Sequence, residues 1–398
     1  MQTTLRDDCG ITFARGYRAA ALNCGIRKSK PDLTLIVSDP PATAAGVFTT
    51  NLFKAAPVCV SQAHLRSERI RAILVNSGNA NAATGAPGHD AALACAAETA
   101  RRLGCAPTEV LIASTGIIGV PLPTEKIVAG LDTLVATAAP SGGAAAAQAI
   151  LTTDTFIKQR ACEVALRGGT VRLGGIAKGA GMIMPNMATM LAFITTDAAI
   201  ERQTLQRLLA RANALSFNRI TVDGDTSTND MALLLANGAS GVTLTPDDEP
   251  IFAAALDALC QALAQLIVRD GEGATKFVTI TVEGCASEHD ADAIARTIAN
   301  SPLVKTAITG CNPNWGRIVA AAGRAGVPFE PATLDVYLNG VLTVRAGGAA
   351  GAQKDVLDAL MRQPEIEIRL VLCAGGAAAT VWTCDLSHEY VSINVDYS

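Results

Sequence analysis

The sequence is poor in charged, aromatic and histidine residues, and each shortage argues against a class of function. Charged residues make up 17% of the 398 residues, with a net charge of −4, so nucleic acid is not expected as a partner. Aromatic residues make up 4%, but 49% of residues are hydrophobic and 35 are glycine, which is typical of a compact globule and not of a disordered chain. The four histidines lie in no zinc or serine-hydrolase motif, so a reaction here would need another base.

Further absences concern the cellular setting and metals. The first residues include Asp7 and Asp8 but no apolar run, so we expect no secretory signal and a cytoplasmic protein. The longest apolar stretches, 144–151 and 253–268, fall short of the roughly 20 residues that a bilayer span needs, so no membrane partner is expected. The 11 cysteines include no Cys-x-x-Cys pair, which predicts reduced thiols and no bound metal.

Short apolar runs alternate with amphipathic stretches, and this alternation predicts a fold of the mixed α and β class. Strands are expected at 33–38, 72–75, 110–113, 277–282, 334–344 and 365–372, and helices at 89–103, 124–138, 204–215 and 253–269. Asn339-Gly340 is a hairpin turn signal within the run at 334–344. Candidate boundaries are the small-residue stretch at 140–147, the acidic turn at 246–250 and the stretch at 284–290, and none of them is a long flexible linker.

Two segments resemble ligand-binding motifs without satisfying them. The 178–181 segment, Lys-Gly-Ala-Gly, places its lysine before the glycines, whereas a phosphate-binding loop needs it after them, and Met184 stands where a dinucleotide fingerprint needs glycine. Acidic and polar residues alternate over 223–229 as calcium ligands do, but Thr228 and Leu234 replace the glycine and glutamate of an EF-hand. We therefore interpret the second segment as a structural loop.

The Gly-rich segment 174–197 carries the most distinctive chemistry. Small residues and Pro185 lead directly into a β-rich strand at Thr189, an approach that can expose the first strand residue and strain a peptide bond. If the Thr189 hydroxyl attacked the carbonyl of Ala188, the cut chain would begin with a threonine that supplies a nucleophile and, in an α-amine of pKa about 7.7 to 8.0, a base. From the residues alone, the simpler interpretation of Thr189 as a β-branched strand residue is favoured.

Several ordered blocks of sequence resemble the ornithine acetyltransferase family, also called the glutamate N-acetyltransferase or ArgJ family. The 178–182 segment reads Lys-Gly-Ala-Gly-Met and the 186–191 segment reads Asn-Met-Ala-Thr-Met-Leu, as in the family signature. The other matching blocks span nearly the whole chain and lie at 76–81, 114–119, 152–155, 216–229, 270–276, 300–305 and 310–317. So many blocks in one order make the resemblance highly specific.

The resemblance implies a self-cleaved enzyme with an N-terminal threonine nucleophile. Thr189 matches the nucleophile, so the chain should split after Ala188 into an alpha chain, 1–188, and a beta chain, 189–398, with a C-terminal lobe from about 284 to 398. The implied fold is an α+β layered sandwich of the ArgJ/DmpA type. The two fragments are expected to assemble as a heterotetramer with two copies of each.

The resemblance also assigns the remaining site residues. Thr115 and Gly116 match the oxyanion-hole pair, a role that suits acetyl transfer through a tetrahedral oxyanion. The substrate-binding positions are matched by Thr152, Lys178, Thr189, Glu272 and Asn394. Ser398 is the counterpart of a terminal hydroxyl ligand, although this tail is one residue shorter than the family pattern. Taken singly, each residue also has a structural interpretation, such as a strand-ending turn for Thr115 and Gly116.

The expected activity moves an acetyl group from N2-acetyl-L-ornithine to L-glutamate in arginine biosynthesis, through an acetyl ester on Thr189. No metal or organic cofactor is expected, and acetyl-CoA remains open as a second acetyl donor. Two alternatives stay open as well. One is an N-terminal nucleophile amidohydrolase or aminopeptidase, in which water accepts the acyl group, and the other is an uncleaved paralogue without catalytic activity.

Overall fold

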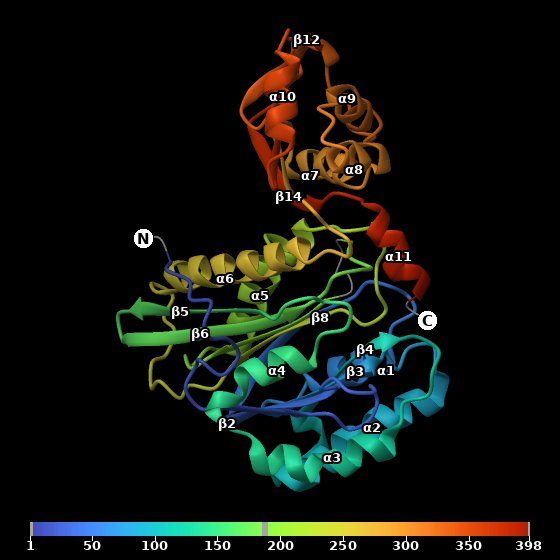
Figure 1. The fold of residues 1–398 in the computed structure, drawn as a ribbon. Helices are drawn as coiled ribbons and strands as arrows, with labels where there is room; N and C mark the ends of the chain where they lie inside the picture. The colour runs from blue at the N-terminus through green and yellow to red at the C-terminus, as the bar shows by residue number, and fades with distance from the viewer. Residues whose placement is uncertain (1–2, 185–189, 397–398) are drawn as a thin grey trace. The chain divides into compact units, whose positions relative to one another are not determined.

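The computed structural model describes residues 3–184 and 190–396, and the chain forms two compact units. The first comprises Met1–Asn218 and Asp225–Ile267, and the second comprises Arg219–Gly224 and Val268–Ser398. Each unit contains helices and strands, which confirms the expected mixed α and β class (Figure 1). The expected cleavage site at Ala188 and Thr189 and the expected ligand Ser398 lie outside the described residues.

The first unit is built on an eight-stranded sheet in the order β4-β3-β2-β8-β7-β6-β5, with β1 paired to β2. Its strands are β1 (Tyr17–Leu22), β2 (Leu33–Phe48), β3 (Ile70–Asn79), β4 (Val110–Ile117), β5 (Lys158–Leu166), β6 (Gly169–Lys178), β7 (Leu191–Thr196) and β8 (Met231–Ala236). β7 and β8 run parallel with Leu191 opposite Met231, so the residues that precede the two strands lie side by side. β3 and β4 are also parallel.

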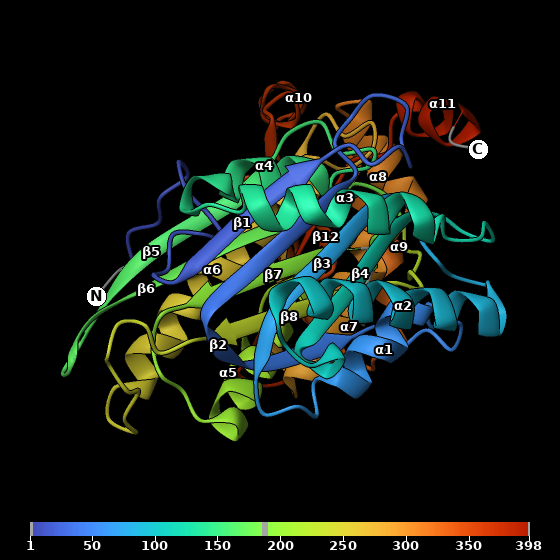
Figure 2. The same ribbon diagram turned by 90° about the horizontal axis from the view of Figure 1, so that it is seen from below.

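Helices cover both sides of this sheet. They are α1 (Ala56–His64), α2 (Gly85–Leu103), α3 (Thr124–Thr137), α4 (Gly143–Ala149), α5 (Arg202–Ala214) and α6 (Glu249–Arg269). Figure 1 shows α5 and α6 on one side of the strands β5 to β8, and Figure 2 shows α1 and α2 over β3 and β4, with α3 over β1 and β2. One core cluster joins Ile73 and Leu111 to Phe193 and Leu233, so the two halves of the sheet pack face to face as layers of a sandwich.

Strand β2 is longer than the expected 33–38 because it changes partner at its prolines. Its regular pairing with β3 runs as far as Val37, a register shift follows, Ala42 still faces Ile70 of β3, and pairing with β8 begins at Thr43. Pro40 and Pro41 lie at this break, where their missing N–H groups cost no ladder hydrogen bond. The prolines therefore mark a change of partner within one strand and not its end.

Helix α6 is longer than the apolar stretch 253–268 that was judged from the sequence to be too short for a bilayer span. It has 21 residues with a mean hydropathy of 1.9, so by length and composition alone it could cross a membrane. Leu256, Leu259 and Leu263 are nevertheless fully buried. A Cβ at Gly175 of β6 would lie 3.0 Å from Leu263 Cδ1, so the helix packs closely on the sheet as a core helix does.

The second unit has its own sheet and its own core. The sheet order is β12-β11-β10-β13-β9-β14, built from β9 (Phe277–Cys285), β10 (Asp335–Leu338), β11 (Val341–Arg345), β12 (Gly348–Ala349), β13 (Glu365–Val371) and β14 (Ala377–Cys384). Its helices are α7 (Glu288–Ala299), α8 (Pro302–Thr309), α9 (Trp315–Gly323), α10 (Lys354–Met361) and α11 (His388–Asp396). Asn339 and Gly340 have positive φ angles and form the predicted turn between β10 and β11.

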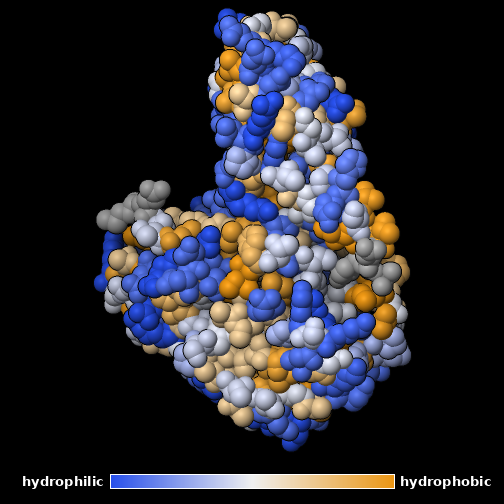
Figure 3. Space-filling view, viewed as in Figure 1, coloured by the Kyte–Doolittle hydropathy of each residue, from blue (hydrophilic) through white to orange (hydrophobic). Residues whose placement is uncertain are grey.

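On the face shown in Figure 3, hydrophilic and apolar residues are mixed over the surface.

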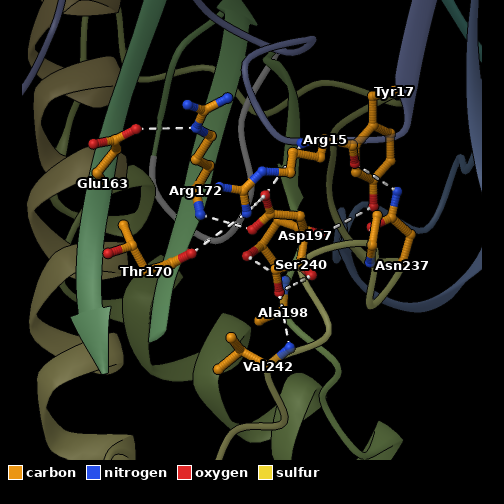
Figure 4. A network of polar contacts seen from close by, with 12 residues as sticks. Arg15, Tyr17, Glu163, Thr170, Arg172, Asp197, Ala198, Asn237, Ser240 and Val242 are labelled. Atoms are coloured by element: carbon orange, nitrogen blue, oxygen red, sulfur yellow. Dashed lines mark hydrogen bonds and ion pairs between the residues drawn. The ribbon is translucent and has the colours of Figure 1, made fainter. Parts of the chain in front are cut away.

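A buried carboxylate anchors the carboxyl end of β7 in the first unit (Figure 4). Asp197 Oδ1 accepts the Arg172 N–H at 2.7 Å, and Oδ2 lies 3.1 Å from Arg15 Nη1. The Asp197 carbonyl accepts a hydrogen bond from Ser240 Oγ at 2.6 Å. Both carboxylate oxygens have partners, so this end of the strand is fixed without an unsatisfied buried charge.

Candidate active site

Thr115 and Gly116 lie near the end of β4, where its pairing with β3 becomes irregular. The register shifts at Gly78 and Asn79, and Asn79 faces both Thr115 and Ile117. Gly116 has a φ of +134°, and a Cβ there would lie 2.3 Å from the carbonyl carbon of Gly78. Only glycine fits this close crossing of two backbones. An irregular ladder at a strand end frees backbone N–H groups for a ligand, which is what an oxyanion site requires.

Lys178 is the last residue of β6, and its ammonium lies beside two other expected site residues. Nζ donates to Thr152 Oγ1 at 2.8 Å and to Thr115 Oγ1 at 3.3 Å. The Lys178 side chain is 2% exposed, so this charge is buried and not solvated. The fold therefore gathers three expected residues from β4, β6 and the loop before β5.

A buried ion pair that the sequence analysis missed supports this cluster. Asp154 Oδ1 accepts from Lys158 Nζ and from the Gly179 N–H, both at 2.7 Å, and Oδ2 accepts the Thr152 N–H at 2.9 Å. Burial alone would raise the pKa of Asp154, but the charges of Lys178 and Lys158 lower that pKa below its ordinary value. Asp154 is therefore an anion that holds Thr152 and the end of β6 in place. The sequence did offer one sign of this role, since Asp154 lies within the 152–155 block that resembles the family.

A second missed carboxyl, Asp230, directly precedes β8. Its side chain is fully buried, and Oδ1 accepts the Met190 N–H at 2.9 Å. Burial raises the pKa of the Asp230 carboxyl well above its ordinary range, against the opposing effects of the Met190 N–H and the Lys178 charge. The neighbouring Asn229 donates to the Ser114 carbonyl at 2.9 Å and so ties this loop to β4. The alternation of acidic and polar residues over 223–229 pointed to this loop in the sequence, but it ended at residue 229 and so did not include Asp230.

Two more of the expected residues that the structure describes lie in the second unit. Glu272 and Asn394 are brought together, since Asn394 Nδ2 donates to Glu272 Oε2 at 2.8 Å. Asn394 is exposed on α11, and Glu272 lies in the loop between α6 and β9. Within residues 3–184 and 190–396, no group of three or more His, Cys, Asp or Glu side chains is arranged to hold a metal ion.

The cluster in the first unit combines buried hydroxyls with an excess of positive charge. Two buried lysines, Lys158 and Lys178, face one ionised carboxylate, Asp154, while burial favours the neutral form of the Asp230 carboxyl. A site of this kind attracts a carboxylate ligand, because a buried cation is stabilised most by an anion that replaces its lost hydration. Thr115 and Thr152 add hydroxyl groups that can orient such a ligand.

Comparison with known proteins agrees with the blocks found in the sequence. The model of the ArgJ family matches residues 18–398. The "Arginine biosynthesis bifunctional protein ArgJ" of Chlorobaculum tepidum is 51% identical, over 97% of this chain and 96% of the relative. A crystal structure of that protein from Bacillus halodurans has 40% identity and a TM-score of 0.49, and the match covers 51% of this chain and 97% of that one.

A second solved structure in the comparison contains a small molecule. It is ornithine acetyltransferase from Mycobacterium tuberculosis complexed with ornithine, with 41% identity and a TM-score of 0.43 over 46% of this chain and 98% of that one. The family match and the near full-length identity carry the assignment. The chain belongs to the ArgJ family.

Proposed function

We propose that this ArgJ-family enzyme transfers the acetyl group of N2-acetyl-L-ornithine to L-glutamate in arginine biosynthesis, through an acetyl ester on Thr189. One observation supports the proposal best. The buried Lys178 ammonium donates hydrogen bonds to both Thr115 and Thr152, next to Gly116, where the backbones of β3 and β4 approach closely. The Mycobacterium tuberculosis relative, an ornithine acetyltransferase, was solved with ornithine. An amino-acid substrate suits a buried cation that can pair with its α-carboxylate.

The chain is first proposed to cut itself. The Thr189 hydroxyl oxygen attacks the carbonyl carbon of Ala188, the bond between that carbon and the Thr189 nitrogen breaks, and the nitrogen takes the hydroxyl proton. Water then hydrolyses the resulting ester, which leaves a carboxylate on Ala188 and a free hydroxyl and α-amine on Thr189. The products are an alpha chain of 188 residues and a beta chain of 210.

Transfer follows as two exchanges of one acetyl group. The α-amine takes the Thr189 hydroxyl proton while the oxygen attacks the acetyl carbonyl of N2-acetylornithine, and ornithine leaves as an amine that carries the proton. The amine of glutamate then attacks the ester, and Thr189 recovers its proton. Thr115 and the backbone at Gly116 are proposed to stabilise the oxyanion of each tetrahedral intermediate, and removal of one such donor typically slows a reaction by about 10² to 10³.

The other expected features extend this proposal. Thr152 and Lys178 are proposed to bind the substrate carboxylate end, and Glu272, Asn394 and Ser398 to complete substrate binding. The reaction needs no metal or organic cofactor, and acetyl-CoA is a candidate second donor. The two chains are proposed to assemble as a heterotetramer with two of each, acting in the cytoplasm.

Product analysis tests the reaction. Purified protein is incubated with N2-acetyl-L-ornithine, with and without L-glutamate, and the products are separated by mass spectrometry. We expect ornithine and N-acetylglutamate in equal amounts when glutamate is present. Release of acetate without N-acetylglutamate would instead support an amidohydrolase. A separate incubation with acetyl-CoA and glutamate tests the second donor.

A further inference from the structure

We propose that a cavity in the second unit, between the 310–316 turn and helix α10, binds a nucleoside phosphate, with the base against Trp315 and the phosphates between Lys354 and Arg362. The cavity has a volume of about 750 Å³, which lies within the range of small-molecule sites. All of its lining residues belong to the second unit, and none has a role in the proposed acetyl transfer. The proposal therefore adds a second ligand and stands independently of the proposed function.

A buried lysine behind the cavity holds its two walls together. Lys276 Nζ donates to the Ile308 carbonyl at 3.0 Å and to Cys311 Sγ at 2.9 Å on the side of the turn, and to the Met361 carbonyl at the end of α10. Lys276 is 9% exposed, so solvent competes little for these bonds. The turn and the helix end are thus fixed relative to each other, and the cavity is formed before any ligand enters.

The same lysine contributes to an excess of positive charge at the cavity. Its three acceptors are two backbone carbonyls and a cysteine sulfur, and none of them is a carboxylate. Lys354 and Arg362 line the cavity with one carboxylate, Asp358, whose Oδ2 lies 2.5 Å from Lys354 Nζ. Three cations around one anion favour a negatively charged ligand, because a cation removed from water is stabilised by an anion that replaces its hydration.

The two lining cations are spaced for an extended anion. Lys354 begins α10 and Arg362 is its C-cap, so about 12 Å of helix axis separates their backbones. Asp358 raises the pKa of the Lys354 ammonium through a hydrogen bond, and the Arg362 charge opposes that effect, so the two cations repel each other. Among the described residues, none forms an ion pair or hydrogen bond with the Arg362 guanidinium. A single phosphate reaches one of these cations, whereas a diphosphate or triphosphate bridges the gap and relieves their repulsion.

The rest of the lining suits a flat ring. Trp315 begins α9 and is half-buried against the core of the second unit, and Pro313 and Leu357 add aliphatic surface. Aromatic side chains hold nucleotide bases by stacking, and the exposed amide of Asn312 offers a donor and an acceptor to a ring edge. The start of α9 at this wall adds the positive end of a helix dipole. These features favour a nucleotide over a simple anion.

The chain has two tryptophans, which allows a direct binding experiment. Trp382→Phe leaves Trp315 as the single tryptophan, and its fluorescence in the full-length protein is titrated with ADP, ATP, coenzyme A, adenosine and inorganic pyrophosphate. Calorimetry on the wild type measures the same affinities. We expect ADP to bind saturably with a dissociation constant of about 1 mM or below, and at least tenfold more tightly than adenosine or pyrophosphate, since each of these fills half of the cavity. Tighter binding of coenzyme A than of ADP would identify the nucleotide end of that molecule as the ligand, and the reverse order would identify a free nucleotide.

Variants separate the two halves of the cavity. Arg362→Ala should weaken the binding of ADP and of pyrophosphate by about tenfold each, because both lose a charged partner. Trp315→Leu, followed by calorimetry, should weaken ADP by about tenfold and leave pyrophosphate unchanged. Arg345→Ala is the matched control, because Arg345 is an exposed arginine at the end of β11 in the same unit and does not line the cavity. This variant should bind ADP as the wild type does.

Three results would overturn the proposal. The first is the absence of saturable binding of ADP, ATP and coenzyme A up to about 5 mM. The second is an equal loss of ADP affinity in Arg345→Ala and Arg362→Ala, which would mean unspecific attraction to surface charge. The third is pyrophosphate binding as tightly as ADP, which would mean a site for simple anions. If Trp315→Leu does not fold, the comparison of ADP with pyrophosphate on the wild type decides alone. The titrations contain no acetyl donor, so a failure of the proposed acetyl transfer would leave their outcome unchanged.

Discussion

Alanine at Gly116 should disable the proposed oxyanion site while leaving the rest of the fold in place. The new Cβ would lie 2.3 Å from the Gly78 carbonyl carbon and 2.5 Å from the Asn79 nitrogen, closer than any real contact. Both neighbours are backbone atoms, so no side chain can rotate away to make room. The β3 and β4 strand ends must therefore separate, and the backbone donors at residues 115 and 116 move with them.

Gly116→Ala should lower both the stability of the protein, for a conformational reason, and its kcat, for a catalytic one. A φ of +134° is one that alanine rarely adopts, which costs about 1 to 3 kcal/mol of stability. Displacement of one oxyanion donor lowers kcat by about 10² to 10³. KM for N2-acetylornithine should change much less, because the donor acts on charge that develops only in the transition state.

Gly104→Ala is the control for the conformational part. Gly104 ends α2 with a φ of +66°, and a Cβ there would have nothing within 4 Å. This variant should lose about 1 kcal/mol of stability and keep full activity. Thermal unfolding, self-cleavage by intact mass, and steady-state transfer are measured on both variants. A folded Gly116→Ala enzyme with near wild-type cleavage and kcat would refute the oxyanion assignment.

Three further predictions concern the buried charges. Lys178→Met should raise KM for N2-acetylornithine in steady-state transfer assays by about 10-fold or more, because the substrate carboxylate loses its cation; an unchanged KM would contradict this. Asp154→Asn should lower the free energy of unfolding at pH 7 by about 3 to 5 kcal/mol in urea titrations, as one partner of a buried pair is lost. Since the Asp154 pKa is lowered, the stability difference between wild type and Asp154→Asn should be complete above about pH 5 and should shrink as pH falls below about 4. A stability difference that does not change with pH would refute this prediction. The Asp230 pKa is raised, so the wild type should lose stability relative to Asp230→Asn as pH rises from 5 to 8, and parallel melting curves would speak against this.

Much of the fold follows from local sequence pattern. Apolar spacing over 204–215 predicted the buried face of α5, where Leu205, Leu208 and Leu209 are in the core. The Asn339-Gly340 signal predicted the β10–β11 hairpin because its positive φ angles suit few other residues. The full length of β2 was missed, because a local pattern treats Pro40 and Pro41 as a stop and cannot show that the strand changes partner there.

In the candidate site, too, residues within matching sequence blocks were predicted, and residues whose roles depend on long-range contacts were missed. The family blocks identified Thr115, Thr152 and Lys178, and the structure brings their side chains together. Asp154 and Asp230 were missed because their roles depend on contacts across 25 and 40 residues of chain, to Gly179 and Met190. An isolated aspartate in a polar loop carries no sign of burial in the sequence. Only the long-range pairing of β7 with β8 places Asp230 beside the residue that follows Thr189.

The intact mass of freshly purified protein tests the central claim most directly. We predict two species of 188 and 210 residues, the second beginning with Thr189, and a single uncut chain for Thr189→Ala. The uncut variant should also form no N-acetylglutamate. A wild-type protein that stays a single chain of 398 residues while making N-acetylglutamate, or a Thr189→Ala variant that splits at the same bond, would contradict the account.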